Sequence, residues 1–234
     1  MIEIKNISKK FGKLEVLKNV SVSCNSGQCI ALIGPNGCGK TTLIKSILGM
    51  VIPDSGSMEF NQKSIFGDYL YREKIGYMPQ IGRYPDTMTI GEIIEMVKKI
   101  RNSKDNLDED LFRDFEIEKM LNKQMRTLSG GTTQKISAVL AFMFNPDVLI
   151  LDEPTAGLDP LAAEVLKEKI IKEKGKGKLI LITSHLLSEL DDLISEIIFM
   201  QDGKIFFHKK VNELKEETQE DKISKAIAKI LRAN

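Results

Sequence analysis

Two segments of the chain contain the residue types that bind phosphate. The first is GPNGCGKTT at residues 34–42, which fits the pattern G-x-x-x-x-G-K-[ST]. Its glycines let backbone N–H groups curve around phosphates, Lys40 would reach the outer two phosphates, and the Thr41 hydroxyl would bind Mg²⁺. The second is LSGGTTQK at residues 128–135, where a polar cap and two glycines open a helix, another place suited to phosphate. A chain with two phosphate-binding segments needs an explanation.

Two acidic side chains follow the apolar run VLIL, in the segment VLILDEP at residues 148–154. Such a run predicts a buried strand, and open α/β sheets bind ligands where their strands end. Asp152 fits the shell of a Mg²⁺ ion, and Glu153 is placed to polarise a water molecule for attack on a γ-phosphate. His185 ends another predicted strand, where a neutral imidazole would contact the γ-phosphate. A structural histidine is the alternative at that position.

The three cysteines are an odd number without the spacing of a metal site, which favours thiols in a reducing compartment. Cys38 lies inside the first phosphate-binding segment, near the start of a predicted helix that would favour its thiolate form. Modification of that thiol would then block nucleotide binding. The alternative is that Cys38 is simply a small residue that the loop tolerates.

Composition indicates a soluble globular protein, with 234 residues, 42% hydrophobic and 29% charged. The net charge of +1 gives no electrostatic reason to expect a nucleic-acid partner. No apolar run approaches the ~18–20 residues of a membrane span, and the first ten residues do not resemble a signal peptide. We therefore expect a cytoplasmic protein.

Apolar periodicity predicts strands alternating with helices, hence an α/β fold. A strand, the glycine loop and a helix follow one another over residues 29–50, the context that a phosphate loop requires. Further strands are predicted at residues 2–12, 20–34, 74–80, 148–154 and 178–185, with a hairpin at 196–208. Helices are predicted at residues 135–144, 159–177 and 186–196.

Residues 83–127 are rich in methionine and charge and are predicted to be helical, with Thr89 and Glu92 at capping-box spacing. We interpret residues of about 83–140 as a helical lobe inserted into an α/β domain that covers residues 1–211. A short helical tail follows at 212–234. Its apolar stripe would pack on the body of the protein or bind a partner; the stripe consists of Ile223, Ala226, Ile227, Ile230 and Leu231.

From Ile2 to about Phe207, the chain resembles the ATP-binding subunits of ABC (ATP-binding cassette) transporters. The resemblance implies a P-loop NTPase fold of the ABC type, with a mainly parallel sheet core, an N-terminal antiparallel β region and the helical lobe. Phe11 lies where the family stacks an aromatic ring on adenine, with a core phenylalanine as the alternative. The phosphate-binding positions of the family match Gly34, Pro35, Asn36, Gly37, Cys38, Gly39, Lys40, Thr41 and Thr42.

The resemblance also assigns roles to the other motifs. Gln80 matches the Q-loop, a contact of Mg²⁺ and of the reacting phosphate. Asp152 and Glu153 match the Walker B pair, residues 157–159 match the D-loop, and His185 matches the switch histidine. Catalysis by Lys40, Gln80, Glu153 and His185 with Mg²⁺ would hydrolyse ATP.

The family also explains the second phosphate-binding segment. In ABC ATPases the signature, here Leu128–Gly131, contacts the γ-phosphate of ATP bound to the other subunit. Ser129, Gly130 and Gly131 would therefore hold the nucleotide of a partner in a head-to-tail homodimer that encloses two Mg-ATP. Thr132 departs from the family's commonest residue, glutamine, and we expect activity to survive this change.

The implied function is to drive a separate integral-membrane permease at the cytoplasmic face of the membrane, with residues 81–90 receiving the permease. An ordinary surface loop is the alternative for residues 81–90. PTAGLDP at 154–160 resembles ATPases of exporter-type permeases. The segment 125–170 resembles the ATPases of nitrous-oxide-reductase maturation and copper processing. The alternatives are a soluble regulatory ATPase or a translation-associated ATPase, neither of which has a permease.

Overall fold

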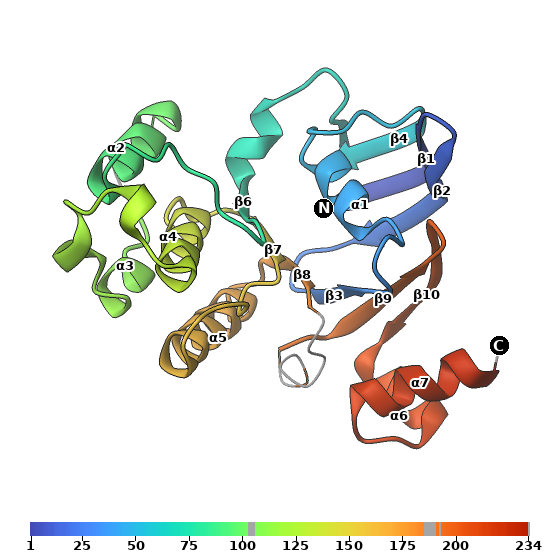
Figure 1. The fold of residues 1–234 in the computed structure, drawn as a ribbon. Helices are drawn as coiled ribbons and strands as arrows, with labels where there is room; N and C mark the ends of the chain where they lie inside the picture. Colours follow the sequence, from blue (N-terminus) through green and yellow to red (C-terminus); the bar gives the residue numbers. More distant parts are fainter. Residues whose placement is uncertain (103–105, 185–190, 192, 234) are drawn as a thin grey trace. The chain divides into compact units, whose positions relative to one another are not determined.

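The computed structural model describes residues 1–102, 106–184, 191 and 193–233 (Figure 1). Contacts divide the chain into two compact units. The first unit combines Met1–Arg72 with Leu179–Asn234, and the second is Glu73–Lys178. None of the helices in the described ranges is both long enough and apolar enough to cross a membrane.

The first unit contains an antiparallel sheet of four strands, in the order β2-β1-β4-β5. Figure 1 shows β2, β1 and β4 side by side. Ile2 and Ile4, two residues apart at the start of β1, are both buried, as a strand with one covered face requires. This sheet is the predicted N-terminal antiparallel region. The strands are β1 (Ile2–Phe11), β2 (Leu14–Cys24), β4 (Ser55–Phe60) and β5 (Lys63–Ser64).

A second set of strands in the first unit has the order β10-β9-β3-β8. Strand β3 pairs in parallel with both β8 and β9, while β9 and β10 form the predicted hairpin. Strands β3 and β8 are buried along their whole length, which fits parallel strands covered on both faces. The elements are β3 (Cys29–Ile33), α1 (Lys40–Ile47), β8 (Leu179–Thr183), β9 (Glu196–Gln201) and β10 (Lys204–Lys210).

The tail forms two helices, α6 (Val211–Thr218) and α7 (Ile223–Ala233), which pack against each other at the end of β10 (Figure 1). Ile223 and Ala226 are fully buried. Leu231 is 37% exposed, so the buried stripe is narrower than the sequence predicts. The tail therefore packs on the unit that it follows.

In the second unit, β6 (Ile75–Met78) and β7 (Val148–Asp152) pair in parallel. The predicted strand at residues 74–80 is shorter than expected, because β6 ends two residues before Gln80. The predicted capping box is present: Thr89 Oγ1 accepts from Glu92 N at 3.2 Å, and Glu92 Oε2 accepts from Thr89 N at 2.8 Å.

The helices of the second unit occupy the predicted helical positions. Segment 107–121 forms two short helices, one α-helix and one 3-10 helix. The α-helices are α2 (Ile90–Ile100), α3 (Asp110–Asp114), α4 (Gly130–Phe142) and α5 (Pro160–Gly175), and the 3-10 helices are Ile117–Met120 and Met125–Thr127. A further 3-10 helix, Leu70–Lys74, precedes β6. The whole is an α/β fold with mostly parallel core strands, as predicted.

Candidate nucleotide site

The first unit carries the predicted phosphate loop, residues 34–39, between β3 and α1. Gly34 has a φ of 149°, and a Cβ atom there would lie 2.1 Å from the carbonyl oxygen of Met200. Gly39 has a φ of 109°, and its Cβ would lie 2.8 Å from the carbonyl oxygen of Val16. Neighbouring backbone therefore encloses the loop so closely that only glycine fits at these two positions.

Lys40 is the first residue of α1, and its side chain turns back over the loop. Its ammonium donates to the Gly34 carbonyl at 2.7 Å and to the Pro35 carbonyl at 3.2 Å. The Cys38 sulfur lies 3.9 Å from the same ammonium and is buried. The Thr41 side chain is exposed in the first turn of α1. Loop amides, a cation and an accessible hydroxyl thus lie together, as a polyphosphate with Mg²⁺ requires.

Phe11 ends β1 and is 50% exposed. The alternative of a core phenylalanine is therefore wrong. The Lys9 ammonium lies 5.5 Å from the centroid of the Phe11 ring, within the range of a cation–π contact. An exposed ring at this turn is available to a flat ligand.

The second unit carries the two acidic residues at the end of β7. Asp152 is almost fully buried as the last residue of the strand. Glu153 follows with a φ of 53°, a left-handed conformation that is uncommon for residues other than glycine. This turn directs the chain away from the strand immediately after Asp152. Such strained residues concentrate at functional sites.

The signature segment forms the start of α4. Ser129 caps this helix, with its Oγ accepting from the Thr132 N–H at 3.2 Å. Thr132, where the sequence departs from the family pattern, also has its hydroxyl 2.9 Å from Ser129 Oγ. The hydroxyl of Thr132 therefore supports the capping serine. Ser129 and Gly130 are both exposed at the helix N-terminus, which favours anions.

Contacts that the sequence analysis missed tie α4 to the turn after β7. A Cβ atom at Gly131 would lie 2.6 Å from the Gly157 carbonyl oxygen, so the two backbones touch. Lys135 pairs with Asp159 at 2.7 Å, and its hydrogen bond lowers the pKa of that carboxyl. The sequence shows Lys135 in LSGGTTQK, but its partner Asp159 lies 24 residues further along the chain, so no short pattern predicts this ion pair.

Gln80 is exposed two residues beyond β6. The chain that follows it packs on α4: the Tyr84 hydroxyl lies 2.9 Å from Ser137 Oγ, and a Cβ at Gly82 would lie 2.3 Å from that oxygen. Burial raises the pKa of Tyr84. The segment after Gln80 is therefore fixed to the signature helix. His185 lies outside the described residues, as does most of the helix predicted to follow it.

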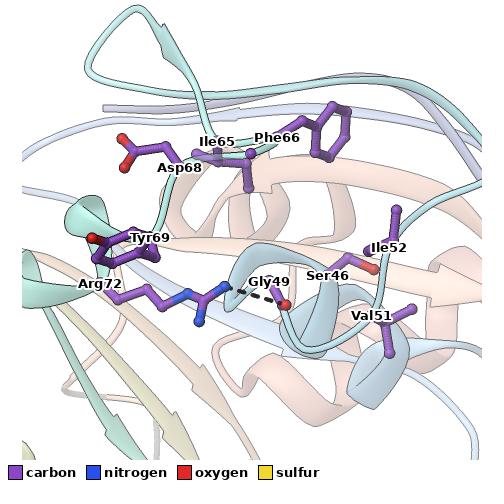
Figure 2. A pocket seen from close by; sticks show the side chains of 10 residues that line it. Ser46, Gly49, Val51, Ile52, Ile65, Phe66, Asp68, Tyr69 and Arg72 are labelled. Carbon is purple, nitrogen blue, oxygen red and sulfur yellow. Dashed lines mark hydrogen bonds between the residues drawn. The ribbon is translucent and has the colours of Figure 1, made fainter.

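A cavity of about 290 Å³ lies at the other end of α1 (Figure 2). Ser46, Ile52 and Phe66 contribute to its lining, and Arg72 Nη2 donates to the Gly49 carbonyl beside it at 3.4 Å. Helix α1 has eight residues, so about 12 Å separates this cavity from the phosphate loop. The cavity is not part of the phosphate site.

The phosphate loop between a strand and a helix, with the acidic strand end, defines a P-loop nucleotide-binding protein. A family model described as ABC transporter matches residues 17–156. The chain belongs to this family as an ATP-binding subunit, and it is an ATPase of the ABC type.

Relatives with curated names cover most of the chain. The Nod factor export ATP-binding protein I of Ralstonia nicotianae is 30% identical over 92% of this chain and 68% of its own length. The ABC-type transporter ATP-binding protein EcsA of Bacillus subtilis is 31% identical over 93% and 90%. The lantibiotic transport ATP-binding protein SrtF of Streptococcus pyogenes is 32% identical over 89% and 90%.

Solved structures share the fold. A structure described as the ATP-binding subunit of an ABC transporter has a TM-score of 0.91 and 26% identity, and covers 99% of both chains. A dimeric post-hydrolysis cassette bound to ADP and phosphate has a TM-score of 0.80 and 23% identity, and covers 90% of this chain and 99% of its own.

Proposed function

We propose that this chain is the motor subunit of an ABC exporter, and that ATP hydrolysis in a homodimer drives a separate membrane permease. The main support is the Lys40 ammonium, which turns back over a loop that has no room for a side chain at Gly34 and Gly39. The names of the relatives from Ralstonia and Streptococcus, which concern export and lantibiotic transport, support the exporter class. The protein would act at the cytoplasmic face of the membrane and would touch the membrane only through its permease.

The residues of the phosphate loop would bind ATP. Loop amides and Lys40 would hold the phosphates, while Phe11 stacks on adenine. Thr41, Gln80 and Asp152 supply hydroxyl, amide and carboxylate oxygens, the donor types that Mg²⁺ prefers. When bound, Mg²⁺ would neutralise charge on the phosphate oxygens.

Glu153 and His185 would act on the γ-phosphate. Glu153 would orient the attacking water, and the left-handed backbone at this residue supports a special role. His185 would contact the γ-phosphate. Together with Lys40, these side chains stabilise charge rather than form covalent bonds.

The signature would bind the nucleotide of the partner subunit. The Ser129 hydroxyl and the N–H groups of Gly130 and Gly131 are at the exposed start of α4, where the helix dipole favours a γ-phosphate. Each nucleotide would then lie between the phosphate loop of one subunit and the signature of the other. This arrangement accounts for two phosphate-binding segments in one chain.

Coupling to the permease would pass through Gln80. The segment after it packs on α4 through Tyr84 and Ser137, so a change at the γ-phosphate would move the signature helix as well. Residues 81–90 would contact the permease, and Ile81 in this segment is 69% exposed.

We propose residues 1–211 as the ATPase domain, with a lobe at about 83–140 and a tail at 212–234. A link to copper processing or nitrous-oxide-reductase maturation rests only on the resemblance of segment 125–170.

Glu153→Gln tests the catalytic assignment. The amide keeps the size of the side chain but cannot activate water, so turnover should fall by about 10²-fold or more while ATP binding is kept. Size-exclusion chromatography should show an ATP-dependent dimer that persists. The matched control is Glu164→Gln on the exposed side of α5, which should hydrolyse ATP normally. Normal turnover by Glu153→Gln would remove Glu153 from its role.

A soluble regulatory or translation-associated ATPase without a permease is the second candidate. Purification with candidate permeases separates the two functions. A permease that binds the chain and stimulates its ATPase activity supports transport. If no permease encoded by a neighbouring gene binds the chain or stimulates its ATPase activity, the soluble alternative is favoured.

A further inference from the structure

Asp54 holds the end of β1 beyond the point where β1 stops pairing with β4. The last pair between these strands is Ser8 with Ser55, and the Asp54 N–H donates to the Ser8 carbonyl at 2.9 Å. Two residues further along β1, the Lys10 N–H donates to Asp54 Oδ2 at 2.7 Å. The carboxylate thus replaces the missing strand partner immediately before Phe11.

The other oxygen of Asp54 holds Lys9. The Lys9 ammonium lies 2.7 Å from Asp54 Oδ1, and the same ammonium contacts the Phe11 ring. The hydrogen bonds from Lys9 and from the Lys10 N–H lower the pKa of Asp54, so the carboxylate is charged at neutral pH. Within the described ranges, no other aromatic ring contacts Phe11. The pairing with β2 continues to Phe11, so this carboxylate binds the free edge of the backbone before the ring and also the cation beside it.

The position of Asp54 is set two residues later, at Gly56. Gly56 has a φ of 92°, and a Cβ there would lie 2.5 Å from the carbonyl oxygen of Asn6. Asn6 has a φ of 54° and belongs to a bulge of β1. Because only glycine allows this approach, the bulge locks the register of β1 and β4. The fixed register therefore keeps the Asp54 carboxylate within hydrogen-bond distance of the Lys10 N–H.

We propose that Asp54 is a positioning residue for the nucleotide base: through Lys9 and the Lys10 N–H, it holds Phe11 where the ring stacks on adenine. This inference rests on the proposed function, in which Phe11 contacts adenine. An exposed ring that is already ordered loses less entropy when a base stacks on it. Without the carboxylate, Phe11 would become ordered only when ATP binds, and the lost entropy would weaken the affinity for ATP.

The test compares ATP with inorganic tripolyphosphate, which has phosphates but no base. Asp54→Ala should weaken ATP binding about fivefold, the scale of one exposed ion pair, and leave tripolyphosphate binding unchanged. The matched control is Glu15→Ala, which removes an ion pair to Lys10 (3.6 Å) without touching Lys9. This control should bind both ligands like the unmodified protein.

A second arm combines the change with Phe11→Ala. In that background, Asp54→Ala should cause no further loss of ATP affinity, because the ring that it positions is gone. Asp54→Asn keeps an acceptor for the Lys10 N–H and replaces the alanine variant if that variant unfolds. It should lose part of the affinity for ATP and none of the affinity for tripolyphosphate.

Three outcomes would overturn the proposal: equal loss for both ligands, a loss that adds to that of Phe11→Ala, or unchanged ATP affinity. Lys40→Ala distinguishes this failure from failure of the proposed function. If the chain is the proposed ATPase, Lys40→Ala weakens binding of ATP and of tripolyphosphate. If Lys40→Ala weakens binding of both ligands but the Asp54 variants do not selectively weaken ATP binding, the proposed function stands and only the positioning role of Asp54 is wrong.

Discussion

At the scale of single residues, the two signature glycines differ in their surroundings. A Cβ atom at Gly131 would meet the Gly157 carbonyl oxygen at 2.6 Å, whereas a Cβ at Gly130 would meet nothing within 4 Å. Neither glycine is among the residues with positive φ, so alanine is compatible with both backbones. Only Gly131 is therefore needed for close packing against the turn after β7.

Gly131→Ala should destabilise the protein by about 1–3 kcal/mol, because the methyl group overpacks against fixed backbone. Gly130→Ala is the matched control and should leave stability equal or up to about 1 kcal/mol higher, since alanine favours a helix. Urea unfolding measures both variants. Equal stability of the two variants would show that the contact between Gly131 and Gly157 is not tight.

At the scale of elements, buried charges join α5 to the start of α3. The Lys169 ammonium lies 2.5 Å from Asp108, 2.8 Å from Asp110 and 3.0 Å from Glu173, and its side chain is only 3% exposed. Burial alone would raise the pKa of Glu173, but hydrogen bonds from Lys176, Lys178 and Lys169 lower it to about 2. The buried lysine and the carboxylates therefore compensate each other's charge inside the protein.

Lys169→Met should cost about 3–5 kcal/mol at pH 7, because it leaves buried carboxylates without their shared cation. Lys172→Met removes a cation that also pairs with Asp110, at 2.6 Å, but is 55% exposed, so it should cost less than about 1 kcal/mol. Chemical unfolding of both variants measures the difference. Similar small losses would show that the buried cluster adds little stability.

The same cluster predicts a dependence on pH. Because the pKa of Glu173 is lower in the folded protein than the usual 4.5, its contribution is complete above about pH 4.5. The contribution is lost as the pH falls toward 2 and the folded protein takes up the proton. The unmodified protein should therefore lose more stability over this range than Lys169→Met does.

At the scale of the whole molecule, the proposed homodimer divides each nucleotide site between two chains. Lys40→Ala damages the phosphate loop, and Ser129→Arg places bulk and charge where the γ-phosphate of the partner would lie. Every site in either homodimer is damaged, so each variant alone should be nearly inactive. A heterodimer of the two variants should contain one site with both defects and one site with neither.

The measurement is ATP occlusion by the mixture, with heterodimers isolated through two affinity tags. The mixture should occlude ATP where the separate variants do not, even if hydrolysis requires both sites and stays slow. If both segments served one nucleotide within one chain, mixing would restore nothing. Isolated heterodimers that occlude no more ATP than their parents would overturn the shared site.

Most elements could be predicted from the sequence because their signals are local. The capping box at Thr89, the Asp159 cap of α5 and the hairpin at Asp202 depend on residues within one turn. The predicted strand end at Gln80 was two residues too long, since β6 ends at Met78. The pairing of β6 with β7 ends at Met78.

Residue types and their short spacing suffice to predict the phosphate loop, the acidic strand end and the signature, because a local pattern carries the chemistry of each segment. Contacts between distant parts of the chain appear only in the folded protein. Asp54 meets Lys10 across 44 residues, Lys135 meets Asp159 across 24, and Lys169 meets Asp108 across 61. Approach over such separations follows from how strands and helices pack, and no short pattern encodes it.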